Sequence, residues 1–507
     1  MSEAAHPPAR IAIIGAGVSG LCLALKLKAA HHDDFVVYEK AETIGGVWRD
    51  NSYPGLSCDI PSRTYCYSFA PNSEWTSYFS SGPEILRYLN DVADAHGVRS
   101  HLRVGEEVTT AAFHDGAWSL TTASGTVHRH DFLICATGVL VRPKVPDLPG
   151  LDTFEGAAFH SSRWDHSVDT AGRRIAVVGT GSTGVQITCA LAGTAKHFFL
   201  FQRSPQWVFP KPNKAYTRLT KSAHRHLPAF TRLADGLWRR AFEKTISTAV
   251  VKRGWQRWVL AQGCRLALLQ VRSPELRRRL TPDYPPLCKR LVAAAGFYRA
   301  VQRANVSVVC DSIERITPNG IVTKNGTACD VDIIVFATGF QADAYMRPMT
   351  ITGLDGVTLD DAWADGPRGY QTVALPGFPN LFMLAGPNSP FSNESVMRTA
   401  ETQADYIMKW IRLFNEGTVR WAAPTQEATD CFNAAVRRAL PGTTFSAGCA
   451  SWYQDTQGVP VVWPWSVRAH RSMLARVESD HFHIEPGPRS PRRPRPGDGP
   501  GPSTLPR

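Results

Sequence analysis

The sequence predicts an α/β protein with two Rossmann-like dinucleotide-binding domains and a helical insertion. Three observations predict this fold. A Gly-x-Gly-x-x-Gly turn stands between a short apolar run and a helix-like run at residues 15–20, and a second one stands at residues 179–184. The stretch 211–285 is poor in glycine and rich in Arg, Leu, Ala and Trp, which indicates helices. A strand, a glycine turn, a helix and a strand in this order predict a βαβ unit.

The length and composition are those of a globular protein with several domains. The 507 residues are 43% hydrophobic and 20% charged, and at about 100–200 residues per domain the length predicts two to four domains. These values exclude a small disulfide scaffold, a fibrous chain and a wholly disordered chain. No stretch approaches ~18 consecutive apolar residues, so we expect no transmembrane segment.

The net charge of +12 is concentrated in two segments. Residues 211–253 carry eleven Lys or Arg against two acidic residues, and residues 486–507 carry five Arg against one acidic residue. No recognisable nucleic-acid-reading module lies beside either segment, so we expect no nucleic-acid partner.

The cysteines indicate neither a metal site nor a disulfide framework. There are eleven, with no Cys-x-x-Cys pair and no zinc-like spacing. Residues 1–10 show no signal-peptide pattern. We therefore expect a reduced, cytoplasmic protein whose cysteines are mostly core thiols.

The first glycine turn has the residues that a dinucleotide requires. Gly15 permits the tight turn, Gly17 lets a pyrophosphate approach the backbone, and Gly20 lets helix and strand pack closely. Glu39 follows Gly20 by 19 residues, where a carboxylate accepts hydrogen bonds from ribose hydroxyls. We expect this unit to hold FAD.

The second glycine turn differs at the position that selects the ribose. Arg203 follows the last glycine by 19 residues and stands where the first unit has an acid, and Ser204 adds a hydroxyl donor. A guanidinium binds a 2′-phosphate, whereas a carboxylate repels it, so we expect NADPH here. The alternative is that Arg203 is a solvated loop residue. The predicted contacts of the turn itself are Gly179, Gly181, Ser182 and Gly184.

Two further apolar runs predict where the chain crosses between the domains. Residues 132–138 and 332–339 each read as a buried strand that ends in Ala-Thr-Gly. The expected organisation is an FAD-binding domain at 1–150 and 330–485, an NADPH-binding domain at 151–210 and 286–329, a helical insertion at 211–285 and a disordered tail at 486–507.

Three long motifs resemble those of Baeyer–Villiger monooxygenases. Residues 154–165 resemble the fingerprint FxGxxxHxxxW(P/D), and residues 45–59 resemble the element GGxWxxxxYPGxxxD. Residues 286–290, which contain Lys289-Arg290, resemble a third family element and are followed by Gly-Phe-Tyr at 296–298. The resemblance runs from about residue 10 to residue 480.

The resemblance implies an FAD- and NADPH-dependent enzyme. Such an enzyme inserts one oxygen atom from O₂ next to a ketone carbonyl and gives an ester or lactone. Reduced flavin and O₂ form a C4a-peroxyflavin, whose anion attacks the ketone. Arg290 matches the arginine that favours this anion, and Asp59 matches the aspartate that orients the arginine. The further cofactor contacts that the resemblance implies are Gly46, Trp48, Asp59, Tyr65, Thr137, Thr338 and Gly339.

Three other residues receive roles from the resemblance. His160 is implied to couple domain movement to the flavin site, with a packing histidine as the open alternative. Trp452 is implied to donate its indole N–H to the nicotinamide-cofactor ribose and to line the substrate pocket, although Ala450 stands where many members have Asn. A core tryptophan is the alternative at Trp452. Lys289 is expected to point toward the 2′-phosphate.

Two alternative functions stay open. One is an N- or S-oxidising flavin monooxygenase of the same superfamily, against which Trp164-Asp165 argue, because those enzymes have Tyr or Phe at that point. The other is a non-catalytic FAD-binding protein whose basic insertion and tail contact an anionic surface. The intact set of Asp59, Arg290 and Trp452 argues against it. The expected partners are a small ketone and O₂, and we expect a monomer or a weak dimer.

Overall fold

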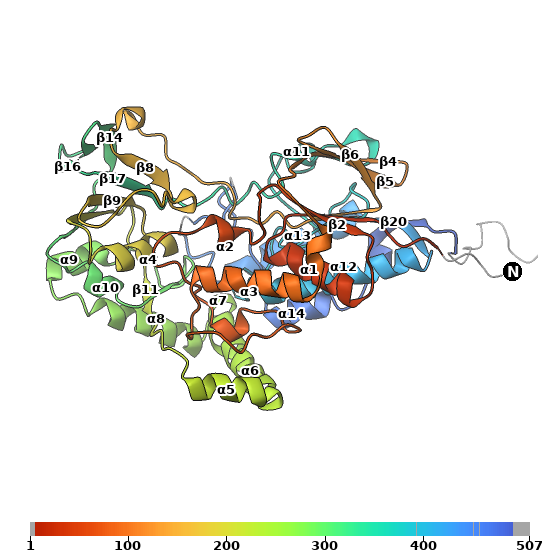
Figure 1. Ribbon diagram of the computed structural model, residues 1–507, viewed down its shortest axis with the longest axis horizontal. Helices are drawn as coiled ribbons and strands as arrows, with labels where there is room; N and C mark the ends of the chain where they lie inside the picture. The colour runs from red at the N-terminus through yellow and green to blue at the C-terminus, as the bar shows by residue number, and fades with distance from the viewer. Residues whose placement is uncertain (1–5, 392, 450, 456, 490–507) are drawn as a thin grey trace, which may run out of the picture.

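Two five-stranded parallel sheets form the centres of the two main domains (Figure 1). The computed structural model describes residues 6–391, 393–449, 451–455 and 457–489. The first sheet has the order β19-β7-β1-β2-β3, with strands Leu381–Met383, Phe132–Cys135, Ile11–Ile14, Phe35–Glu39 and Leu102–Val104. The second has the order β13-β10-β9-β17-β8, with strands Val306–Val309, His197–Phe201, Arg174–Val178, Ile333–Phe336 and Ala157–His160. The predicted α/β fold with two Rossmann-like units is confirmed.

The central strands are apolar because helices or other sheets cover both of their faces. Every residue of β1, β7 and β17 is buried, as expected for parallel sheets with both faces covered. Helices α1 (Val18–Ala29) and α12 (Val396–Asn415) pack against each other over the first sheet. The antiparallel strands β4 (Val108–His114), β5 (Ala117–Thr122) and β6 (Val127–His130) cover the other face of the first sheet. The core between them includes Trp118 of β5 and Phe378.

The glycine turns bring each helix onto the end of its first strand. Gly15 has φ +107°, and a β-carbon added at Gly20 would lie 1.9 Å from the carbonyl oxygen of Gly15. The second unit repeats this geometry, since a β-carbon at Gly184 would lie 2.0 Å from the carbonyl oxygen of Gly179, before helix α4 (Ser182–Leu191). Only a residue without a side chain lets the helix pack this closely.

The boundary between the two domains lies later than expected. Strand β17 at 333–336 pairs with β8 and β9 of the second sheet, so the expected start of the FAD-binding segment at residue 330 is wrong by about one strand. The apolar run of β17 gave no sign of which sheet it joins, because any buried parallel strand reads the same way. The crossing occurs after Phe336, where residues 337–341 run beside residues 142–144.

The expected helical insertion is present and leads the chain away from the second sheet. It comprises α5 (Arg218–His226), α6 (Pro228–Phe242), a π-helical segment (Glu243–Ser247), α7 (Thr248–Val251), α8 (Trp255–Leu268) and α9 (Pro274–Leu280). The short parallel strands β11 (Val208–Pro210) and β12 (Val292–Ala294) flank it. In Figure 1 α5 and α6 form the lowest part of the molecule, α7 and α8 lie above them, and α9 lies at the left near α10.

Part of the expected tail is ordered. Strand β21 (Phe482–Pro486) pairs with β20 (Val419–Pro424), and the N–H groups of Gly487 and Arg489 donate to the carbonyl oxygens of Thr418 and Gly417. The expectation of disorder from residue 486 is therefore wrong for residues 486–489, where backbone pairing compensates for the polar composition. The remainder of the predicted tail, residues 490–507, lies outside the described residues.

The other elements complete the two domains. The remaining helices are α2 (Val47–Asp50), α3 (Gly82–Ala95), α10 (Phe297–Ala300), α11 (Leu359–Ala362), α13 (Gln426–Ala439) and α14 (Val467–Met473). The remaining strands are β14 (Ile313–Thr317), β15 (Gly320–Thr323) and β16 (Ala328–Asp330), which form one antiparallel sheet, and β18 (Thr350–Thr352), which pairs with β4.

The close packing of helix α1 on the first glycine turn can be tested with a matched pair of variants. Gly20→Ala should lower the melting temperature by roughly 5–10 °C, because the added methyl group overlaps the Gly15 carbonyl. Gly17→Ala is the control, since its nearest new neighbour would be 3.6 Å away, and it should shift the melting temperature by no more than about 2 °C. Thermal unfolding followed by circular dichroism measures both values. Equal shifts would show that close packing at Gly20 does not hold the turn.

Candidate active site

An ion pair between Arg290 and Asp59 joins two segments that are distant in the sequence. One guanidinium nitrogen of Arg290 donates to both carboxylate oxygens of Asp59, at 3.2 Å each. The Arg290 side chain is 33% exposed and the Asp59 side chain 21%. The charge of Asp59 raises the pKa of Arg290 above its ordinary value. The site therefore contains a cation that keeps its charge, directed by a carboxylate.

The segment that carries Arg290 is held from three sides. Arg290 lies just before strand β12, whose parallel partner is β11. The Gln206 side chain donates to the carbonyl oxygen of Arg290 at 3.1 Å. The second guanidinium nitrogen of Arg290 donates to the carbonyl oxygen of Phe391 at 3.1 Å. These contacts fix both the backbone and the guanidinium plane.

The loop that carries Asp59 is held by a lysine that the sequence analysis did not single out. Lys211 is only 6% exposed, and its ammonium donates to the carbonyl oxygen of Cys58 at 2.8 Å and to the hydroxyl of Ser57 at 3.3 Å. Burial lowers the pKa of Lys211, and the charge of Asp59 opposes this shift. In the sequence Lys211 is the first residue of the basic stretch and was counted with it, whereas the structure places it next to Asp59.

The Trp452 loop is tied to the arginine segment at two points. The Tyr453 hydroxyl donates to the carbonyl oxygen of Cys288 at 2.5 Å, and a disulfide joins Cys288 to Cys449, with Cα atoms 6.2 Å apart. The expectation of reduced cysteines is wrong for this pair. The two lie 161 residues apart, and no spacing rule links cysteines at such a distance. Ala450, the position of the departure from the family motif, lies outside the described residues.

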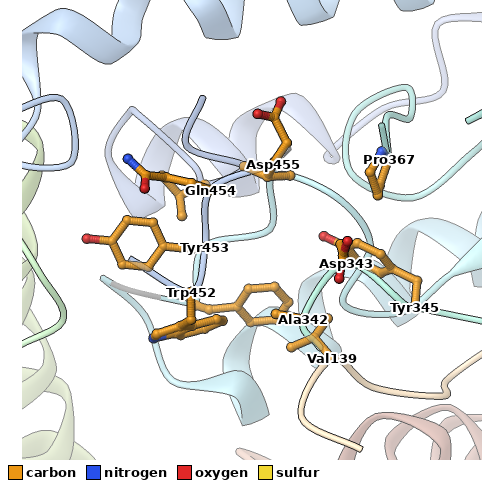
Figure 2. Close-up of a pocket in the computed structure, with 12 residues that line it drawn as sticks. Val139, Ala342, Asp343, Tyr345, Pro367, Trp452, Tyr453, Gln454 and Asp455 are labelled. Atoms are coloured by element: carbon orange, nitrogen blue, oxygen red, sulfur yellow. The ribbon is translucent and has the colours of Figure 1, made fainter. Parts of the chain in front are cut away.

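A pocket opens between the Trp452 loop and the chain crossings (Figure 2). Trp452 is 39% exposed, and its ring and that of Tyr453 project side by side from one loop. Opposite them stand Asp343 and Tyr345, with Val139 below in the view. Ala342, Pro367, Phe391, Gln454, Asp455, Val461 and Val462 complete the lining. Trp452 lies on this lining, and Phe391 connects the pocket to Arg290. That the pocket takes the substrate stays a prediction.

The first glycine turn forms an open cradle beside a buried acid. Glu39 is 5% exposed at the end of β2, and its carboxylate accepts from the N–H of Ala16 at 2.9 Å and of Ala41 at 3.0 Å. Arg49 pairs with the same carboxylate at 3.1 Å. Gly17 begins helix α1 without a side-chain cap. The first N–H groups of the helix are therefore available to an anion.

The segment that follows this cradle brings two of the expected cofactor contacts together. Gly46 lies against Gly17, since a β-carbon added there would be 3.0 Å from the Gly17 Cα. The Trp48 indole N–H donates to the Tyr65 hydroxyl at 3.1 Å, and the two rings meet edge to face. Burial raises the pKa of Tyr65 well above its ordinary value, so its hydroxyl stays protonated.

Two cations and a hydroxyl lie together near the second glycine turn, namely Lys289, Arg203 and Ser204. The Lys289 ammonium donates to the Ser204 hydroxyl at 3.1 Å and lies 4.5 Å from the centre of the Tyr284 ring. Arg203 is exposed beside them, and burial, followed by the charge of Arg203, lowers the pKa of Lys289. The charge of Asp283 acts on Lys289 in the opposite direction, but two cations against one acid leave a net positive charge, which favours an anionic ligand.

The middle of this turn has room for such a ligand. A β-carbon added at Gly181 would meet no atom within 4 Å. Helix α4 begins at Ser182 without a side-chain cap, as α1 does after Gly17. The uncapped helix ends at both turns, together with the open space at Gly181, fit the pyrophosphates of two dinucleotides.

His160, expected to couple domain movement to the flavin site, and the expected cofactor contacts Thr137 and Thr338 lie at the chain crossings. His160 is 4% exposed; its Nδ1 accepts from the Ser162 N–H at 3.2 Å, so the proton lies on Nε2, which donates to the carbonyl oxygen of Gly339 at 3.0 Å. Burial lowers the pKa of His160, which favours the neutral ring. The hydroxyls of Thr137 and Thr338 donate to the carbonyl oxygens of Tyr345 and Lys144. The structure thus places His160 at a crossing, where its hydrogen bonds go to Ser162 and Gly339.

The other fixed positions of the fingerprint are structural. A β-carbon added at Gly156 would lie 2.4 Å from the carbonyl oxygen of Asp332 and 2.6 Å from the Phe154 ring. The Trp164 ring is buried and meets the Phe159 ring edge to face, with centres 5.1 Å apart. Together they seat β8 on the edge of the second sheet.

Comparisons with known proteins identify the family. A family model described as flavin-binding monooxygenase-like matches residues 8–348. An uncharacterized monooxygenase of Mycobacterium tuberculosis is 48% identical, with 94% of this chain and 96% of the relative covered. A Baeyer–Villiger monooxygenase of Streptomyces coelicolor is 37% identical, with 95% and 94% covered.

Solved structures agree with these sequence matches. The closed crystal structure of cyclohexanone monooxygenase is 30% identical, with a TM-score of 0.85 and coverage of 94% of this chain and 99% of that chain. A complex of OTEMO with FAD and NADP is 29% identical, with a TM-score of 0.86 and coverage of 95% and 100%. The chain therefore belongs to the flavin-binding monooxygenase-like family and, within it, to the Baeyer–Villiger monooxygenases.

Proposed function

We propose that this protein is an FAD- and NADPH-dependent Baeyer–Villiger monooxygenase that converts a ketone into an ester or lactone with one oxygen atom from O₂. The observation that carries the proposal is the Arg290–Asp59 pair beside a pocket, in a chain with two dinucleotide cradles. Membership of the family and the FAD and NADP of the solved relative support the cofactors. A cytoplasmic monomer or weak dimer is part of the proposal.

The two cradles receive different cofactors. We assign FAD to the cradle of Gly15, Gly17 and Gly20, where Glu39 keeps lone pairs that can accept a ribose hydroxyl. NADPH belongs to the second cradle, where Arg203, Ser204 and Lys289 lie together. Bound FAD would accept electrons from NADPH and activate O₂, which is the source of the inserted oxygen atom.

Arg290 stabilises the negative charge that develops on the reacting oxygen. Its guanidinium is always protonated and fixed in orientation, so the site does not reorganise when the charge appears. Asp59 holds the guanidinium on one edge, and the Phe391 carbonyl holds it on another. The remaining N–H groups of the fork are then available to the reacting centre.

The pocket lining favours an apolar ketone. Val139, Phe391 and Val462 give it an apolar surface, and Trp452 stands at its exposed edge. Such a lining excludes water from the reacting oxygen. Asp343 and Asp455 lie on the lining as well and provide acceptors for a polar group on one end of a substrate.

The proposed reaction is tested with isotope-labelled O₂ and a panel of cyclic, linear and aryl ketones. NADPH consumption should rise with an apolar ketone, and the product should gain the mass of one labelled oxygen atom. Thioethers and amines are included in the same panel. Oxidation of those compounds with no ketone turned over would indicate the N- or S-oxidising alternative. A flavin that NADPH cannot bleach would indicate the non-catalytic alternative.

Arg290→Ala should uncouple the reaction. The variant should keep FAD, because the glycine cradle lies elsewhere, and should still consume NADPH and O₂. The yield of ester per NADPH should fall by about 10²–10³-fold, with hydrogen peroxide released in its place. Arg290→Lys should recover little, because a point charge does not reproduce the planar fork.

The matched control for Arg290 is another arginine of the same domain. Arg174 pairs with Asp332 at 2.6 Å and is 35% exposed, close to the 33% of Arg290. Arg174→Ala should leave the ester yield per NADPH unchanged. Near-wild-type yield from Arg290→Ala would contradict the proposed role.

Arg203→Ala and Lys289→Ala should each raise the KM for NADPH by about tenfold or more and leave the KM for NADH nearly unchanged. The reason is that only NADPH carries the 2′-phosphate that these cations are proposed to bind. Arg173→Ala is the control, since Arg173 is exposed just before β9, at the end of the strand away from the glycine turn. Equal losses for NADPH and NADH would refute the 2′-phosphate assignment.

A further inference from the structure

Helix α8 of the insertion carries apolar side chains on both its buried face and its exposed face. Its buried face carries Leu260, Cys264, Ala267 and Leu268. Its outer face carries Trp255, Trp258, Val259 and Leu266 and continues to Leu269 just after the helix. These five side chains are 66%, 64%, 46%, 65% and 59% exposed. Their spacing of three, four or seven residues places them on one stripe. Gln262 stands on the same stripe, which is otherwise apolar. Large apolar side chains gathered on one exposed face are normally covered by other structure, so this stripe lacks a cover.

The sequence around the stripe is rich in positive charge. Residues 244–274 contain six Lys or Arg and no Asp or Glu. Five of the six are exposed, namely Lys244, Lys252, Arg253, Arg265 and Arg272. Within the described residues, none of these five has a carboxylate at ion-pair distance, because the adjacent acids Glu243 and Glu275 pair with Arg471 and Arg279. We call the stripe and these five cations the α8 surface.

A second helix of the insertion repeats this combination. Leu233, Leu237 and Trp238 of α6 are 62%, 56% and 57% exposed, and Arg240 is exposed beside them. In Figure 1 α8 lies below the second sheet, and α6 lies lower still. Exposed tryptophans and leucines are therefore concentrated in the same part of the protein as the free cations.

We propose that the α8 surface binds the face of a membrane that contains anionic lipids. Trp and Leu side chains insert among the acyl chains near the headgroups, and Lys and Arg contact the phosphates. This is an interfacial contact: α8 has 14 residues, and no helix in the described part of the chain is long and apolar enough to cross a membrane.

Charge decides between a lipid surface and a second copy of the chain. In a two-fold dimer the same patch faces itself, so the five unpaired cations of one copy would face those of the other. Like charges brought together in this way oppose association. An anionic lipid surface complements the same cations, which makes it the occupant that the observations favour.

Co-sedimentation of the holoenzyme with vesicles tests the proposal. The wild type should bind vesicles of phosphatidylcholine mixed with phosphatidylglycerol, bind pure phosphatidylcholine much more weakly, and dissociate as salt is raised. Trp255→Ala with Trp258→Ala should lower the partition coefficient about tenfold or more, because two large apolar side chains no longer insert. Arg253→Glu with Arg265→Glu should lower it to a similar extent on the anionic vesicles.

Matched changes elsewhere on the surface serve as controls. Val127→Ala and Arg129→Glu should leave vesicle binding unchanged. Both residues are on β6, where the Val127 side chain is 63% exposed and Arg129 is exposed. The flavin content and melting temperature of each variant show that it is folded, and its rate of NADPH consumption reports on the proposed enzyme separately.

Three results would overturn the membrane proposal. The first is an absence of vesicle binding by the wild type, and the second is equal binding to neutral and anionic vesicles. The third is a dimer, measured by light scattering, that the tryptophan changes convert to monomer, since it would show that a second copy covers the stripe. None of these results depends on whether the enzyme oxidises ketones.

Discussion

The ion pair between Asp59 and Arg290 is the interaction on which the rest of the site depends. Its members come from segments 231 residues apart, one after the first glycine cradle and one in the second domain. A partly buried arginine that loses its carboxylate is left with an uncompensated charge, which is costly. The pair therefore fixes the approach of the two segments and the direction of the guanidinium at once. Lys211, Gln206 and the Phe391 carbonyl support it from different elements.

The same constraint links the active site to the neighbouring loops. Cys288 lies two residues before Arg290, and both its carbonyl oxygen and its sulfur are bonded to the loop of Trp452. His160, which bonds to the Gly339 carbonyl at the crossing, connects the edge of the second sheet to the crossing. A movement of one domain against the other would therefore change the arginine, the pocket wall and the crossing together.

Much of the fold and of the candidate site was predictable from the sequence because the parts concerned are local in the chain. Each glycine turn, its flanking strand and helix, and the acid or arginine that follows lie within about thirty residues and have fixed geometric requirements. The resemblance predicted Asp59 and Arg290 as a pair, and the structure places them in contact. The burial of Lys211 and the Cys288–Cys449 bond were not predictable, because they depend on how distant segments pack. The same reason explains the misplaced boundary at β17 and the paired residues 486–489.

The most direct test of the central claim is a double-mutant cycle on the pair. Ester formed per NADPH consumed is measured for Asp59→Ala, Arg290→Ala and the double variant, with flavin content as the check on folding. If the two residues act as one unit, the double variant loses little more than Arg290→Ala alone, because Asp59 acts only through the arginine. If the two single losses multiply in the double variant, Asp59 and Arg290 act independently and the account of the site is wrong.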